Sequence, residues 1–185
     1  MDRELRARIL RRAIHVFSAG LLSYYLVPPD MWGMGLRREL LVLTFLLPVL
    51  AFEVGRWRHP LRVDGLRENE KRRVSAVAWG AVGLALAFVL FPQMLVVPCV
   101  LGMALVDPLI GELRSGMPRA HPTLPFLAYL AICLVTSLGP ISSLVAAIVA
   151  LLAEAPKIAA VDDDFRMLVA PLAVLYLLEK LHLPW

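Results

Sequence analysis

Apolar residues gather in seven stretches along the chain, and most polar residues lie between them. The stretches cover residues 13–28, 39–54, 74–92, 94–111, 124–140, 141–159 and 167–183. A helix needs roughly 20 largely apolar residues to cross the hydrocarbon core of a bilayer, so each stretch is close to a spanning length. The pattern predicts an all-α, polytopic helical bundle of about seven transmembrane helices, and we expect residues 1–185 to form one membrane-embedded domain.

Two of the connections between these stretches are short and contain proline or glycine. They are Phe91-Pro92-Gln93 and Leu138-Gly139-Pro140, and both predict tight helical hairpins. The first stretch has an arginine-rich flank, as a signal peptide does. No small-residue cleavage site follows residues 24–28, so we expect a retained first helix.

The composition agrees with a membrane protein. Hydrophobic residues make up 59% of the chain and charged residues 18%, whereas soluble domains average about 45–50% and about 25%. A soluble fold of 185 residues has too small a core to bury this much apolar surface. Cys99 and Cys133 lie within apolar stretches without zinc-ligand or CxxC spacing, so the sequence predicts neither a zinc site nor a disulfide.

Basic residues predict the orientation of the bundle. Sixteen of the 19 lysines and arginines fall in one set of alternate connections, and three fall in the other set. Because basic residues are retained on the cytoplasmic side, we expect a cytoplasmic N-terminus and an exoplasmic C-terminus. This bias accounts for the net charge of +4, so nucleic acid is not expected as a partner, whereas anionic membrane lipids are.

Acidic residues gather on the same side as the basic ones. Twelve of the 15 fall on the predicted cytoplasmic side, including Glu53, Asp107, Glu154 and the run Asp162-Asp163-Asp164. His15 lies near the start of the first stretch. A carboxylate inside a membrane helix is unfavourable and usually faces a polar cavity. We therefore expect a cytoplasm-facing polar pocket built from several helices.

Clustered carboxylates beside arginine and lysine favour a hard cation such as Mg²⁺ together with phosphate groups. Phosphoryl transfer depends mostly on positioning and on neutralising the charge of the transferred group, which such a pocket supplies. The sequence contains no GxxxxGK[ST] or GxGxxG motif, which excludes a P-loop or Rossmann nucleotide site.

Several segments, in order, are similar to motifs of the membrane polyprenol kinases, a group that includes dolichol kinase, phytol kinase and CTP-dependent diacylglycerol kinase. The segments are RRAIHVFSAG, FEVGR, ENEKRRVSAVAWGAVGLALAFVLFP, LVDPLIGELRSG and LLAEAPKIAAVDDDFRMLVAPL. Together they extend over residues 11–172. The chain departs from the family pattern at RAHPTLPFLAYL, where a Lys-[Ser/Thr]-x-Glu-Gly motif is usual and this chain has neither lysine nor glutamate. Arg114, Arg119 or His121 would have to replace that lysine.

The resemblance implies an enzyme that transfers a phosphoryl group from a nucleoside triphosphate, with CTP the first choice, to a lipid alcohol. The residues expected to hold Mg²⁺ are Asp107, Asp163, Asp164 and Glu154. The residues expected to contact the phosphates are Arg12, Lys71, Arg72, Arg73, Arg114 and Lys157. Either Asp107 or His15 is expected to orient or deprotonate the lipid hydroxyl. Supporting roles are expected for Glu53, Arg56, Glu70 and Gly111.

Simpler interpretations stay open for the same residues. Glu53 and Arg56 are three residues apart and also fit a helix-surface ion pair, and Asp162–Asp164 also fit a turn that caps the last helix. Two other functions are compatible with the pattern: a membrane cytidylyltransferase, which releases pyrophosphate, and a non-enzymatic lipid carrier. The identity of the lipid alcohol and the presence of a homo-oligomer are left open by the sequence.

Overall fold

The computed structural model describes residues 3–31, 33, 35–59, 73–136, 138–156, 158 and 160–181. Within these residues the chain forms seven α-helices and no β-strand, so the predicted all-α class is confirmed. The helices are α1 (Arg3–Gly20), α2 (Leu40–Arg58), α3 (Ala76–Leu90), α4 (Gln93–Gly116), α5 (Thr123–Val135), α6 (Pro140–Glu154) and α7 (Asp163–Lys180). Two 3₁₀ helices, η1 (Leu21–Leu26) and η3 (Pro118–Ala120), extend α1 and follow α4.

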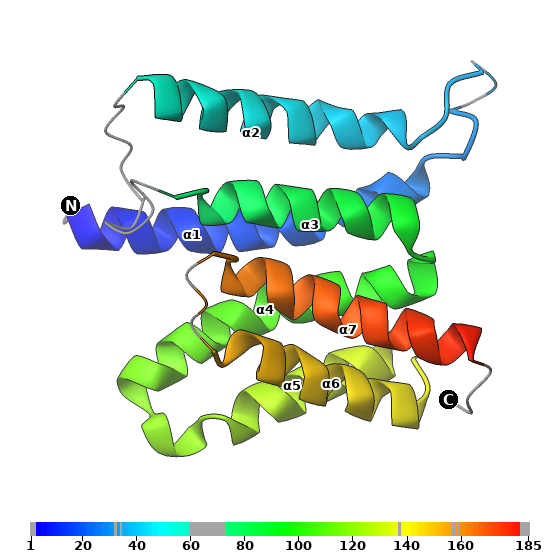
Figure 1. The fold of residues 1–185 in the computed structure, drawn as a ribbon. Coiled ribbons are helices and arrows are strands. Elements are labelled where there is room, and N and C mark those ends of the chain that lie inside the picture. Colours follow the sequence, from blue (N-terminus) through cyan, green and yellow to red (C-terminus); the bar gives the residue numbers. More distant parts are fainter. Residues whose placement is uncertain are drawn as a thin grey trace.

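Successive helices run in alternating directions, as Figure 1 shows. The start of α1, the end of α2 and the start of α3 lie at one end of the bundle. The end of α4, the start of α5, the end of α6 and the start of α7 lie at the same end, on the left of Figure 1. The two predicted hairpins therefore reverse the chain as expected. The helix ends that border the basic connections of the sequence lie at this end, which we call the basic end.

Helix α1 and the last helices differ from the predicted stretches. Residues 13–28 were expected to form one helix, but α1 begins at Arg3, and the backbone changes to 3₁₀ geometry at Leu21. The charged residues before residue 13 are good helix formers, although they are not apolar. Helix α6 was expected to reach residue 159 but ends at Glu154, because Pro156 restricts the residue before it.

Polar side chains define where α3 and α7 begin. The hydroxyl oxygen of Ser75 accepts a hydrogen bond from the backbone N–H of Ala78 at 3.2 Å. The carboxylate of Asp162 accepts one from the backbone N–H of Asp164 at 3.2 Å. Each bond satisfies one of the N–H groups that a helix start leaves unpaired. The interpretation of Asp162–Asp164 as a capping turn is confirmed, and it places Asp163 and Asp164 in the first turn of α7.

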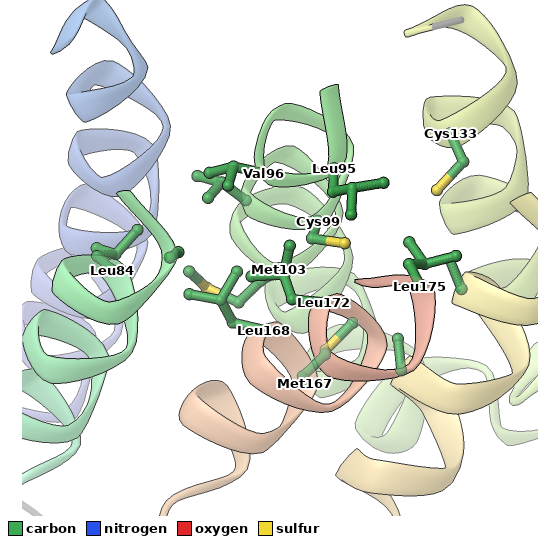
Figure 2. Close-up of a cluster of buried hydrophobic side chains, with 14 of the residues drawn as sticks. Leu84, Leu95, Val96, Cys99, Met103, Cys133, Met167, Leu168, Leu172 and Leu175 are labelled. Carbon is green, nitrogen blue, oxygen red and sulfur yellow. The ribbon is translucent and has the colours of Figure 1, made fainter. Parts of the chain in front are cut away.

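The core lies where α4 and α7 meet the other helices. Figure 2 shows buried side chains of α3, α4, α5 and α7 pointing toward one another. The buried residues labelled there are Leu84, Leu95, Val96, Cys99, Met103, Cys133, Met167, Leu168, Leu172 and Leu175. Helix α7 also packs extensively along α6, and α1 packs against α4. Helices α4 and α7 are therefore held from several sides, which fixes the positions of their polar residues.

Small residues allow close helix approach. A Cβ atom on Gly102 of α4 would lie 2.4 Å from the ring of Tyr129, a fully buried residue of α5. On α3, Ala78, Ala81 and Gly83 are buried, and Gly83 faces Phe165 of α7. The small-residue run of α3 thus serves helix packing.

Two helices are long and apolar enough to cross a membrane by length and composition: α2, and residues Gln93–Arg114 of α4. Only 17% of the apolar window of α2 is buried inside the protein, compared with 56% for α4. Helices α3, α5 and α6 are apolar but shorter. Because most of α2 is uncovered, it does not resemble the core helix of a soluble protein.

Candidate functional site

Four helices bring ionisable side chains together at the basic end. His15 of α1, Asp107 of α4 and Asp164 of α7 each offer a ligand atom, and these atoms all lie within 4.8 Å of one another. A second group consists of Asp107, Glu154 of α6 and Asp163 of α7, whose ligand atoms also lie within 4.8 Å of one another. Asp107 belongs to both groups. All five residues were selected from the sequence, and the fold places them in one site, which we call the carboxylate site.

His15 is held between two carboxylates. Its Nε2 lies 3.3 Å from Oδ2 of Asp107 and 3.9 Å from Oδ2 of Asp164. The side chain of His15 is 12% exposed, and those of Asp107 and Asp164 are 22% and 18% exposed. An imidazole fixed in this way by a carboxylate has the arrangement of a positioned acid or base.

The carboxylates of the second group repel one another. Two unit charges of the same sign 4.8 Å apart, the largest separation within the group, repel by about 3.5 kcal/mol at an effective dielectric constant of about 20. The first turn of α7 reduces this repulsion, because the positive end of the helix dipole lies beside Asp163 and Asp164. A cation in the group would reduce it further. Three carboxylates form the hard oxygen donor set that Mg²⁺ prefers, so these residues fit that ion.

Two arginines are paired with carboxylates at the same end. Nη2 of Arg114 donates a hydrogen bond to Oε2 of Glu154 at 2.8 Å, which links α4 to α6. Nη2 of Arg12 donates to Oε1 of Glu112, which links α1 to α4. The side chains of Arg114 and Arg12 are 38% and 54% exposed. Both guanidinium groups therefore lie partly in solvent, and Arg114 contacts the carboxylate site directly through Glu154.

Glu53 and Arg56 form a different, buried cluster. Glu53 accepts hydrogen bonds from Nε and Nη2 of Arg56, from Nε1 of Trp57, and from the backbone N–H and hydroxyl of Ser75. Nη2 of Arg56 also donates to the carbonyl of Arg73 at 2.5 Å. The predicted ion pair between Glu53 and Arg56 is confirmed, but its expected position on the helix surface is wrong, because both residues are buried. The cluster ties the end of α2 to the start of α3.

The remaining predicted residues belong to neither ligand group of the carboxylate site or lie outside the described residues. Arg73 is exposed, and its carbonyl belongs to the Glu53 cluster. Gly111 is exposed in α4, with open space where a Cβ atom would lie. Glu70, Lys71, Arg72 and Lys157 lie outside the described residues.

Two residues that join helices at the basic end were not expected from the sequence. Arg166 of α7 donates to the carbonyls of Ala153 and Pro156, and so joins the end of α6 to the start of α7 next to Glu154. No sequence signal marked it, because the bonds depend on how α6 and α7 meet. Ser75 was also missed, although a serine directly before an apolar helix is a recognisable capping signal.

Comparison of the chain with models of known protein families, with curated proteins and with solved structures finds no match.

Proposed function

We propose that the protein is a membrane lipid kinase, which transfers the terminal phosphoryl group of a nucleoside triphosphate, CTP in the first instance, to a polyprenol-type lipid alcohol. The observation that carries the proposal is the carboxylate site. His15, Asp107, Glu154, Asp163 and Asp164 come from four helices and meet at the end of the bundle where basic residues also gather. Phosphoryl transfer needs both kinds of charge in one place.

The proposed enzyme is embedded in a lipid bilayer. We propose that all seven helices form a membrane bundle with the basic end in the cytoplasm. The alternating helix directions support this orientation, because they bring the helix ends that border the basic connections to one end. The two apolar helices of spanning length support insertion, as do the exposed apolar side chains of α1, such as Val16 and Phe17. The nucleotide would then approach from the cytoplasm, and the lipid alcohol from within the membrane.

We assign each polar group of the site a role. Asp107, Glu154, Asp163 and Asp164 would hold Mg²⁺, which neutralises charge on the phosphates when bound. Arg12 and Arg114 would contact the phosphates through their exposed donors. In this role Arg114 replaces the lysine of the Lys-[Ser/Thr]-x-Glu-Gly motif that is usual in the polyprenol kinases. Glu53 and Arg56 support the site by fixing the start of α3.

His15 is the proposed proton acceptor. In the reaction, the lipid hydroxyl oxygen forms a bond to the terminal phosphorus, and the bond from that phosphorus to the bridging oxygen breaks. The electron pair of the broken bond stays with the departing nucleoside diphosphate. The hydroxyl proton passes to the imidazole of His15, which the carboxylate of Asp107 orients at 3.3 Å.

The proposal is tested with purified protein in lipid nanodiscs. CTP, ATP, GTP and UTP are each combined with dolichol, phytol, a short prenol and diacylglycerol, and phosphorylated lipid is measured. We expect product in at least one combination. Asp107→Asn is expected to lower the rate by about 100-fold or more, because it removes a charge shared by both ligand groups.

Asp30→Asn is the matched control, since Asp30 is exposed beyond the opposite end of α1 and undergoes the same chemical change. It is expected to keep the wild-type rate. No phosphorylated lipid in any combination would contradict the kinase proposal. Equal rates for Asp107→Asn and wild type would contradict the site assignment.

A further inference from the structure

Glu154 is a buried carboxylate that pairs with an arginine and also belongs to a group of potential cation ligands. The side chain is 4% exposed, and its Oε2 accepts the 2.8 Å hydrogen bond from Arg114. The same side chain lies within the 4.8 Å limit of Asp107 and Asp163 as a cation ligand. Arg114 therefore supplies a positive charge in direct contact with Glu154, whose carboxylate also belongs to the group that would hold a divalent cation.

We infer that Glu154 is shared: Arg114 holds it when no divalent cation is bound, and a bound cation takes it and releases Arg114 toward the phosphates of the nucleotide. This inference rests on the proposed function, whose site it describes in more detail. A divalent cation attracts a carboxylate more strongly than a guanidinium does, because it carries twice the charge and bonds directly. Arg114 can leave without being buried unpaired, since 38% of its side chain already faces solvent.

The pair of Arg12 and Glu112 provides a comparison. It has the same kind of ion pair at the same end of the bundle, but Glu112 belongs to none of the ligand groups and is 57% exposed. Removing Arg12 therefore changes the charge near the site without freeing a ligand. Removing Arg114 changes the charge equally and also frees Glu154.

The experiment is a titration of the full-length protein with Mn²⁺, followed by electron paramagnetic resonance at pH 7.5, without nucleotide or lipid substrate. Arg114→Gln is expected to bind Mn²⁺ about tenfold more tightly than wild type, and Arg12→Gln less than threefold. Glu154→Gln is expected to bind about tenfold more weakly. In the double variant, the gain from Arg114→Gln is expected to disappear.

Two results would overturn the inference: equal Mn²⁺ affinities for Arg114→Gln and Arg12→Gln, or a gain from Arg114→Gln that persists with Glu154→Gln. The titration is independent of catalysis. If the protein phosphorylates lipid but binds no Mn²⁺, the sharing of Glu154 is overturned and the kinase proposal is not. If the variants shift the Mn²⁺ affinity as expected but the protein phosphorylates no lipid, the kinase proposal is overturned and the sharing of Glu154 is not.

A second measurement uses the wild-type protein and so avoids variants that fail to fold. Phenylglyoxal modifies accessible arginines, and mass spectrometry reports the rate at each position. Saturating Mn²⁺ is expected to speed modification of Arg114 about threefold or more and to leave the exposed Arg119 unchanged. An unchanged rate at Arg114 in protein that binds Mn²⁺ also overturns the inference.

Discussion

Replacing Glu53 by glutamine tests the cluster that joins α2 to α3. The wild-type carboxylate faces Arg56 within hydrogen-bond distance and accepts from the backbone N–H of Ser75 at 3.0 Å and from its hydroxyl at 2.9 Å. The side chains of Glu53 and Arg56 are 9% and 4% exposed. The glutamine variant keeps the shape and one acceptor, but it removes the negative charge that pairs with the buried guanidinium of Arg56.

The expected loss of stability follows from this burial. Removing one partner of a buried ion pair costs about 3–5 kcal/mol, and the acceptor that glutamine retains favours the lower end, about 3 kcal/mol. The control is Glu39→Gln. Glu39 pairs at 3.5 Å with Arg37, whose side chain is 83% exposed, and such surface pairs contribute about 0–1 kcal/mol.

The assay is unfolding in mixed micelles of increasing SDS fraction, followed by circular dichroism. Glu53→Gln is expected to lower the free energy of unfolding by about 3 kcal/mol, and Glu39→Gln by less than about 1 kcal/mol. Equal losses in the two variants would refute the reasoning, because they would mean that the buried cluster contributes no more than a surface pair.

Two further predictions concern packing and orientation. Gly102→Ala is expected to destabilise the protein by about 1–2 kcal/mol in the same assay, because overpacking against the buried ring of Tyr129 exceeds the gain in helix propensity. Gly80→Ala, with open space around the added carbon, is expected to stabilise it by about 0.5–1 kcal/mol, and the opposite order would contradict the described contact of α4 with α5. Cysteines placed at the exposed residues Arg119 and Arg37 are expected to react with a membrane-impermeant maleimide from opposite sides of sealed vesicles, with Arg119→Cys on the cytoplasmic side. Labelling of both from one side would contradict the proposed orientation.

Much of the site was predictable because it depends on topology. Alternating helix directions bring the starts of the apolar stretches 13–28 and 167–183 to the same end as the ends of the stretches 94–111 and 141–159, whatever the rotation of the helices. His15, Asp107, Glu154 and Asp163 could therefore be grouped from their positions in the apolar stretches. Asp162 could be recognised as a cap, since an aspartate directly precedes the helix.

The pairs within the site could not be predicted, because they depend on helix rotation and side-chain reach. Arg114 faces Glu154, 40 residues away, and Arg12 faces Glu112, 100 residues away. No local pattern selects these partners from the other charges at the basic end. The burial of Glu53 has the same origin, because its partner Ser75 is 22 residues away and meets it only when α2 packs on α3.

The predicted helix boundaries were wrong where the polarity of a segment and its helix propensity disagree. Apolar content placed the first helix at residue 13, but a helix outside the hydrophobic region needs only favourable backbone propensity, and α1 begins at Arg3. The change to 3₁₀ geometry at Leu21 brings Tyr24 into a stacked contact with Phe88 of α3, a tertiary contact that local sequence does not reveal.

The most direct test of the proposed function is the fate of isotopic label from CTP incubated with the wild-type protein and a lipid alcohol in nanodiscs. Label in the γ-phosphate is expected to appear in the lipid, while label in the α-phosphate stays in water-soluble CDP. Transfer of the α-label into lipid would instead indicate a cytidylyltransferase. Release of the γ-label as inorganic phosphate, with none in lipid, would contradict lipid phosphorylation.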